Sequence, residues 1–179
     1  MKTSIISICI LLLAISQGLA QEKKAGPVIS EFGKVWPIDN PDFKTDKDRE
    51  FKVMFDIMSS PENHNEINAS IETAARFLNM HAQHGIPQDK LQVALVVHNK
   101  ATKDIMTQEA YMKRYGVPNP NFDLLSALID SGVDVILCGQ SSLSRSVPAE
   151  KTIEGVQLSL SAMTAIIQLT DQNYTLIKF

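Results

Sequence analysis

The chain has little cysteine, few aromatic residues and no excess of basic charge. Two cysteines in 179 residues cannot form a disulfide-rich scaffold, so the core has to be hydrophobic. Lys and Arg number 17 against 20 Asp and Glu, and this acidic balance argues against a nucleic-acid-binding protein, which needs a basic surface. Glycine and proline, eight of each, stay near average usage and exclude collagen-like and low-complexity chains. One globular domain of ordinary size fits this length.

The most apolar run lies at the N-terminus. Lys2 precedes an apolar stretch from Ile5 to Ile15, and the small residues Gly18 and Ala20 stand just before Gln21. This pattern predicts a cleavable signal peptide over residues 1–20. A membrane anchor is the alternative, but about 11 apolar residues are too few to cross a bilayer as a helix. We therefore expect an exported protein, periplasmic or secreted, with no membrane attachment after cleavage.

Cleavage would remove Cys9 and leave Cys138 as the one cysteine. A single exported thiol cannot form an internal disulfide. Cys138 is then a buried small side chain, a partner for an intermolecular disulfide, or a reactive group.

Residues 21–48 are polar and are interrupted by prolines at positions 27, 37 and 41. This composition predicts an arm or linker that lies outside the core of the domain, which we place at residues 49–179. The single tryptophan, Trp36, is expected to dock the arm loosely on its own chain or on a neighbouring subunit.

The rest of the chain alternates strand patterns with helix patterns. Apolar and polar residues alternate from Phe51 to Ile57, and Leu91 to Val97 is an almost unbroken apolar run, typical of a strand that is covered on both faces. Helices are expected behind caps at Asn65 and Asn121. The alternation predicts a three-layer α/β/α sandwich on a mainly parallel five-stranded sheet. Its strands are expected near residues 51–57, 91–97, 133–137, 156–160 and 174–179, and its helices near 67–82, 107–115, 122–129, 139–147 and 163–167.

Two chemically capable residues follow directly after predicted strands. His98 ends one apolar run and Cys138 ends another, so both belong at the edge of the sheet where parallel strands end and ligands bind. A thiol in such a place is shifted toward the thiolate by nearby N–H donors. We predict Cys138 and His98 as catalytic residues. The neighbouring residues predicted to bind a ligand are Asn99, Lys100, Gly139, Gln140 and Ser141.

Each of these assignments has a structural alternative. Cys138 could be a small buried side chain without chemistry, and His98 could cap carbonyls at the strand end. The basic residues near the loop after His98 could bind an anion or simply belong to the solvated surface: Lys100, Lys103, Lys113 and Arg114.

Other chemistries have weaker support. His81 and His84 stand three residues apart beside Met80, a spacing that can ligate metal, but no third ligand lies near them in sequence, so no metal site is predicted. No motif for a nucleophile elbow or a phosphate-binding loop surrounds Ser141, Ser142 or Ser144. No cofactor is predicted.

Four segments in the second half of the chain are similar to one known family. They are Val96-Val97-His98-Asn99-Lys100-Ala101, Asn119-Pro120-Asn121-Phe122-Asp123-Leu124-Leu125, Val135-Ile136-Leu137-Cys138-Gly139-Gln140-Ser141 and Gln172-Asn173-Tyr174-Thr175-Leu176-Ile177-Lys178. Together, from about Phe51 to Phe179, the chain resembles the DsrE/DsrF-like family.

The resemblance implies an α/β/α sandwich on a five-stranded parallel sheet, assembled as homo-oligomeric trimers or hexamers. It also implies sulfur carriage as a persulfide on Cys138, which stands where a family cysteine is found at a strand end. Asn99 departs from the family, because many relatives have glycine at this position. A protein that donates or accepts sulfur would then be a partner.

Two functions remain open on this basis. The chain is an exported sulfur carrier or sulfurtransferase-like protein that uses Cys138, or it is a non-catalytic oligomeric module on the same fold that binds a small ligand or a protein.

Overall fold

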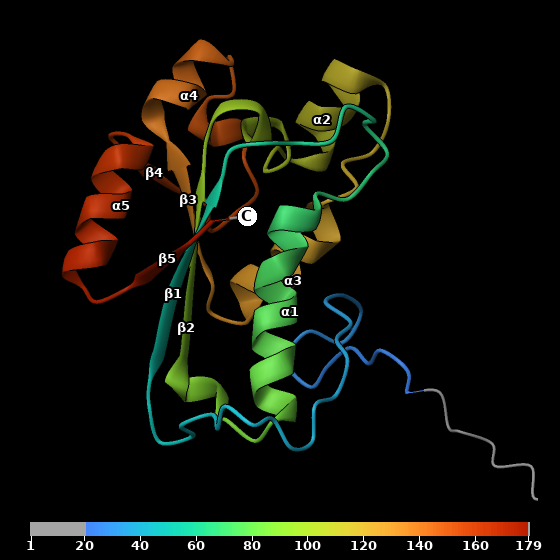
Figure 1. Ribbon diagram of the computed structural model, residues 1–179. Coiled ribbons are helices and arrows are strands. Elements are labelled where there is room, and N and C mark those ends of the chain that lie inside the picture. Colours follow the sequence, from blue (N-terminus) through green and yellow to red (C-terminus); the bar gives the residue numbers. More distant parts are fainter. Residues whose placement is uncertain (1–20, 179) are drawn as a thin grey trace, which may run out of the picture.

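The computed structural model describes residues 21–178, and the predicted signal peptide lies outside them. Its centre is one sheet in which every paired strand runs parallel to its neighbour, in the order β4-β3-β2-β1-β5 (Figure 1). The strands are β1 (Phe51–Ile57), β2 (Leu91–Val97), β3 (Asp134–Cys138), β4 (Gln157–Ser159) and β5 (Thr175–Ile177). Because successive strands from β1 to β4 are neighbours, only the last connection has to cross from one edge of the sheet to the other.

Helices cover both faces of the sheet. Figure 1 shows α1 and α3 on one side of the sheet and α5 on the other, which makes three layers. The predicted fold class is thus confirmed. The α-helices are α1 (Ala69–Gln83), α2 (Gln108–Tyr115), α3 (Phe122–Asp130), α4 (Gly139–Ser144) and α5 (Ala162–Asp171), and shorter 3₁₀ turns are η1 (Gln88–Lys90), η2 (Asn99–Lys103) and η3 (Ala149–Lys151). Among residues 21–178, no helix has the length and apolar character needed to cross a membrane.

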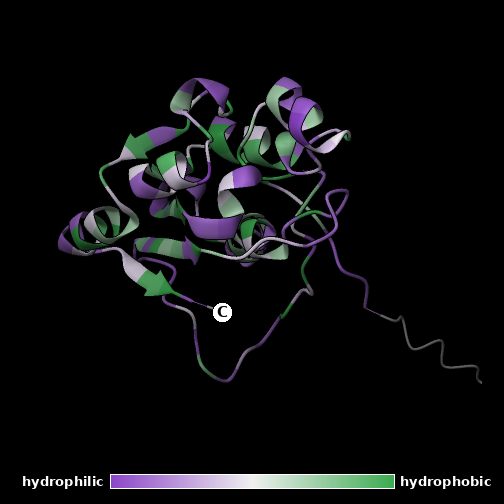
Figure 2. Cartoon of the chain, turned by 90° about the horizontal axis from the view of Figure 1, so that it is seen from above, coloured by the Kyte–Doolittle hydropathy of each residue, from purple (hydrophilic) through white to green (hydrophobic). Residues whose placement is uncertain are grey.

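The side chains of each inner strand alternate between two apolar cores. Val53, Leu95 and Leu137 belong to the larger core under α1 and α3. Met54, Val96 and Cys138 belong to the smaller core under α5. In Figure 2 the helices carry both purple and green segments, as expected for helices with one face on a core and the other in water. Consecutive residues of an inner strand therefore face opposite helix layers.

Helix α1 begins later than the sequence predicted. Its cap is Asn68, whose side chain accepts a hydrogen bond from the Ser70 backbone N–H at 3.0 Å. Asn65, the predicted cap, lies in an exposed turn instead, where its backbone N–H donates to Asn63. Asn121 does occupy the cap position of α3, but its side chain accepts from the Asn68 N–H at 2.7 Å and not from its own helix. Asparagine is common both in turns and at helix N-caps, so the residue type alone could not show which of these asparagines caps a helix.

The expectation that residues 21–48 lie outside the core is wrong for the part around Ile29. Ile29 is only 2% exposed and packs in the larger core. The buried amide of Asn79 on α1 holds it there: its Oδ1 accepts from the Ile29 N–H, and its Nδ2 donates to the carbonyls of Ile29 and Phe32, each at 2.9 Å. Gly33 makes the approach possible, because a Cβ at this residue would lie 2.4 Å from the backbone of Ala75. Trp36, by contrast, remains half exposed.

A buried carboxylate ties three loops together beneath the edge at which the strands end. Asp104, at the end of η2, is 1% exposed. Its carboxylate accepts hydrogen bonds from Asn68 Nδ2 at 2.7 Å and from Ser60 Oγ at 2.8 Å. Its backbone carbonyl accepts from Asn119 Nδ2 at 2.8 Å. Burial raises the pKa of Asp104 to about 6, although Asn68, Ser60 and the charge of Lys103 oppose the shift.

We predict that Asn79→Ala destabilises the protein by about 1–3 kcal/mol, the cost of leaving buried backbone groups without hydrogen-bond partners. Urea denaturation measures this change in the free energy of unfolding. Gln83→Ala is the matched control: Gln83 also contacts the arm from α1, through carbonyls of Lys24 and Gly26, but its contacts are exposed. That variant should change stability by no more than about 0.5 kcal/mol. Equal losses in both variants would show that Asn79 does not hold the segment.

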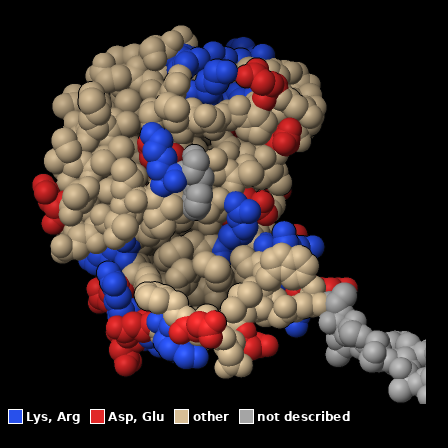
Figure 3. Space-filling view, viewed as in Figure 1, with Lys and Arg blue, Asp and Glu red and all other residues tan. Residues whose placement is uncertain are grey.

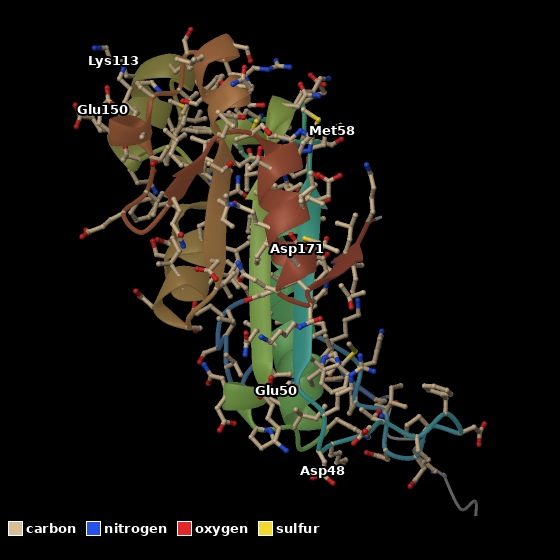
Figure 4. All side chains as sticks on the ribbon, turned by 90° about the vertical axis from the view of Figure 1, so that its left-hand side faces the viewer. Asp48, Glu50, Met58, Lys113, Glu150 and Asp171 are labelled. Atoms are coloured by element: carbon tan, nitrogen blue, oxygen red, sulfur yellow. The ribbon has the colours of Figure 1, made fainter. Side chains whose placement is uncertain are left out.

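We also predict that Asp104 makes stability depend on pH. The folded protein binds its proton more tightly than the unfolded chain does, so the contribution is present below the unfolded pKa of 3.8 and is lost as pH rises through about 6. The free energy of unfolding of the native protein, relative to Asp104→Asn, should fall by about 2 kcal/mol between pH 4 and pH 7, since one pKa unit corresponds to about 1.4 kcal/mol and pH 4 already lies just above the unfolded pKa. Urea denaturation across this pH range tests the slope. The exposed Asp171 at the end of α5 (Figure 4) supplies the control, because Asp171→Asn should keep the native pH profile.

Candidate functional site

The strand ends form one edge of the molecule, and the candidate residues gather there. Met58, directly after β1, marks this edge in Figure 4, whereas Asp48 and Glu50 mark the opposite edge. Val97 of β2 pairs with Leu137 of β3, so the next residues in register are His98 and Cys138. The prediction that both residues lie at the same edge of the sheet is confirmed, and the structure shows that their strands are neighbours.

Cys138 closes β3 and is also the residue before α4. It is 5% exposed and packs in the smaller core, beside Val96 and Ala162. Four groups lower the pKa of its thiol: the backbone N–H and the hydroxyl of Ser141, and the backbone N–H groups of Ala162 and Gln140. Burial raises the pKa of the Cys138 thiol, but these donors lower it by more, so the pKa lies below its ordinary value.

Gly139 allows two elements to meet around that sulfur. A Cβ at Gly139 would lie 2.7 Å from the Ser159 carbonyl oxygen and 3.2 Å from that of Leu160. Any other residue would push the start of α4 away from the end of β4. The glycine thus lets donors from both sides converge: Gln140 and Ser141 from α4, and Ala162 from the start of α5. Gly139 has a structural role in the site.

His98 lies beside Cys138 in register but does not hydrogen-bond to it. Its Nε2 lies 2.6 Å from Asp56 Oδ1, on the strand at the other side of β2. Asp56 Oδ2 also pairs with Lys178 Nζ at 2.9 Å. Burial raises the pKa of Asp56, but Lys178 and His98 lower it by more, so the pKa lies below its usual value. An ionised carboxylate is a stronger acceptor than a thiol, and this explains the orientation of the imidazole.

A single hydroxyl links the loops after β2 and β3. Ser141 Oγ accepts from the Asn99 backbone N–H at 2.9 Å, and the same hydroxyl lowers the pKa of the Cys138 thiol. Asn99 has φ of +52°, a left-handed conformation that asparagine tolerates better than most residues and glycine adopts freely. This conformation gives a physical reason why asparagine or glycine suits the position. The Asn99 side chain accepts a hydrogen bond from Arg145.

The other predicted ligand-binding residues lie at the periphery of the sulfur site. Lys100 forms an ion pair with Glu62 at 3.0 Å. The Gln140 side chain is exposed and donates to the Leu160 carbonyl at 3.4 Å, so this residue acts at the sulfur through its backbone N–H.

The two histidines considered for a metal do not form a site with a third ligand. His81 Nδ1 lies 2.8 Å from the Phe77 carbonyl oxygen, and burial lowers the pKa of His81. Within residues 21–178, no group of three or more His, Cys, Asp or Glu side chains could hold a metal ion.

Sequence reasoning missed Asp56, Lys178, Arg145 and Ala162. Asp56 lies on the polar face of a strand in which apolar and polar residues alternate. Such alternation suggests that the polar face is exposed to solvent and cannot show that α5 covers it. The available signal was an acidic side chain at Asp56, one residue before the end of a buried strand. Ala162 acts through a backbone N–H, which any residue would supply.

The comparisons with known proteins agree with this architecture. The family model of the DsrE/DsrF-like family matches residues 52–179. A protein of unknown function from Methanobacterium thermoautotrophicum, MTH1491, has a solved structure with a TM-score of 0.55 and 14% identity, over 72% of this chain and 99% of that one. The ychN protein from E. coli gives a TM-score of 0.53 and 18% identity over the same shares. At these identities the two structures establish the fold alone.

A comparison with curated proteins finds no match. The family match covers the five strands, apart from Phe51 at the start of β1, and the residues that surround Cys138, from Asp56 to Lys178. The chain belongs to the DsrE/DsrF-like family.

Proposed function

We propose that this protein carries sulfur as a persulfide on Cys138. The observation that carries the proposal is the place of Cys138 at the end of β3, directly before α4, where N–H and O–H groups of Ser141, Gln140 and Ala162 lower the pKa of its thiol. Such donors stabilise a thiolate, which is the nucleophilic form of cysteine. They equally suit the anionic outer sulfur of a persulfide. The chain belongs to the DsrE/DsrF-like family, and the sulfur carriage that its resemblance to this family implies supports the same chemistry.

The chemistry needs no cofactor. The Cys138 thiolate attacks the outer sulfur of a donor persulfide or thiosulfate, the donor S–S bond breaks, and the donor leaves as a thiolate or sulfite with the electron pair. An acceptor thiolate then attacks the outer sulfur on Cys138 and releases the Cys138 thiolate. Each step exchanges one S–S bond for another, so no external oxidant or reductant is consumed.

His98 has a different place in this proposal from the one that the sequence suggested. Its hydrogen bond to Asp56 leaves Ser141 as the side chain that lowers the pKa of the Cys138 thiol. We therefore assign the stabilisation of the thiolate to Ser141 and the backbone donors, and we give His98 no part in activating Cys138.

We further propose that the protein assembles as a homo-oligomer through the outer surface of α4, β4 and α5. Five large apolar residues are exposed on these consecutive elements: Leu143, Leu158, Leu160, Met163 and Ile167. The last three residues of the set are 73%, 73% and 61% exposed. Exposed apolar residues that gather on one surface indicate an interface. Leu160 and Met163 flank Ala162, so a second subunit on this surface would border the sulfur site.

We predict that thiosulfate or polysulfide adds one sulfur atom to the Cys138 peptide of the folded protein, as measured by mass spectrometry. Ser141→Ala should slow this addition several-fold at neutral pH, because it removes one donor to the thiolate. The pH midpoint of iodoacetamide alkylation of Cys138 should rise in the same variant.

Ser144→Ala is the matched control. Ser144 is exposed on the same short helix and its hydroxyl donates only to the Ser141 carbonyl, at 3.4 Å. Sulfur addition in this variant should match that of the native protein. If Cys138 takes up no sulfur and reacts with iodoacetamide only after denaturation, the protein is a binding module that keeps the family fold without its chemistry.

We predict that Met163→Glu reduces the mass measured by light scattering to that of one chain, because a carboxylate in the subunit contact would be desolvated without a partner. Phe43→Glu is the control: Phe43 is 94% exposed but lies in the N-terminal segment, away from α5. This variant should keep the native mass. A native protein that already has the mass of one chain would contradict the assembly.

A further inference from the structure

A second site lies at the same edge of the molecule as Cys138. A cavity of about 220 Å³ opens between the loop after β1, the turn η2, the end of α2 and the segment after α4. Ligand pockets for drug-sized molecules start at roughly 300 Å³, so this cavity suits a smaller ligand. Four segments that are distant in sequence build it, and each of them contributes a basic or polar side chain.

The cavity is basic although the protein is acidic. Four cations line it, Lys100, Lys103, Arg114 and Arg145, and the one carboxylate in its lining is Glu62. The local charge is therefore +3, in a chain whose net charge is −3. Figure 3 shows Lys and Arg gathered at the upper end of the molecule, where Figure 1 places α4 and α2, whereas acidic and basic groups are mixed at the lower end.

Three of the four cations have only neutral partners. Lys103 Nζ donates to the Pro61 carbonyl at 2.8 Å and contacts His64 Nδ1 at 3.0 Å. Arg114 donates to the Arg145 carbonyl at 2.9 Å, and Arg145 donates to Asn99 Oδ1. Within residues 21–178, none of these three forms an ion pair with a carboxylate. Four cations around one carboxylate repel one another, and an anion bound between them would reduce that cost.

An aromatic ring holds two of these cations in place. Lys103 Nζ lies 5.7 Å from the centre of the Tyr115 ring, and Arg114 Cζ lies 5.6 Å from it. These cation–π contacts and the hydrogen bonds to carbonyls order the long side chains before any ligand arrives. Binding then costs less conformational entropy than it would on flexible surface lysines.

We propose that this cavity binds a small tetrahedral oxyanion of the phosphate, sulfate or thiosulfate class. Guanidinium and ammonium donors that converge from several sides match the oxygen atoms of such an anion. The cavity also borders the sulfur site: Asn99 accepts from Arg145 through its side chain and donates to Ser141 Oγ through its backbone. The inference goes beyond the proposed sulfur chemistry and does not depend on it.

The test is calorimetric titration of the full-length protein with sodium phosphate, sulfate and thiosulfate, at constant ionic strength in sodium chloride. We expect saturable binding of one anion per chain. Arg145→Gln and Lys100→Gln should each weaken binding about tenfold, which corresponds to the loss of one charge-assisted contact. Glu62→Gln should strengthen binding, because it removes the one carboxylate in the lining. A purely structural role of these residues would not produce opposite effects.

Lys113→Gln is the matched control. Lys113 precedes Arg114 on α2 but lines a different hollow, together with Glu150 (Figure 4). It carries the same change of charge as the test variants and should leave the affinity within about twofold. Circular dichroism confirms that each variant is folded. Should one test variant fail to fold, the other and Glu62→Gln still decide the result.

Three outcomes would overturn the proposal: no saturable binding to the native protein, an equal loss in Lys113→Gln, or no gain in Glu62→Gln. Cys138→Ser separates this proposal from the sulfur chemistry, because it should bind phosphate as the native protein does. Failure of persulfide formation with intact phosphate binding would remove the proposed function alone.

Discussion

Parallel pairing of β1, β2 and β3 aligns Ile57, Val97 and Leu137 across the sheet, and the chemistry of the molecule depends on this register. The residues after these three face the α5 side, together with Asp56. The Cys138 sulfur can therefore meet the donors at the start of α5, and the His98 imidazole can meet Asp56. A shift of one residue in β3 would turn the sulfur toward α1 and α3, where those donors are absent.

The inner strands and the chemically important edge were predictable because their signals are local. β1 and β2 match their predicted ranges, since residues 51–57 alternate and residues 91–97 are apolar on both faces. β4 and β5 are edge strands of three residues each, shorter than predicted, because each has a partner on one side only. The place of Cys138 at a strand end followed from the same patterns.

Long-range polar contacts account for what the sequence could not show. Asn79 looked like an ordinary residue of a helix, yet it binds the backbone of a segment 50 residues earlier. Asn121 makes no capping bond to its own helix and accepts instead from the Asn68 backbone N–H. His98 turns toward Asp56 because of a charge on a neighbouring strand. In each case the side chain type was visible in the sequence, but its partner depends on the packing of the finished fold.

Asp56 and Asp104, the two shielded carboxylates near this edge, show that hydrogen-bond and charge partners decide whether a buried carboxylate has a lowered or a raised pKa. Desolvation acts on both Asp56 and Asp104 and favours the neutral acid. Asp56 faces Lys178 and His98, so its pKa falls and it stays ionised to orient the imidazole. Asp104 is bound by the neutral donors of Asn68 and Ser60, with Lys103 acting only through its charge, so its pKa rises to about 6. Lys103 instead points toward the basic cavity, where it contacts His64 and the Tyr115 ring. Lys103 thus lines the basic cavity together with Lys100, Arg114 and Arg145, with Glu62 as the one carboxylate in the lining, and this edge keeps a net positive charge where an anion can reach it.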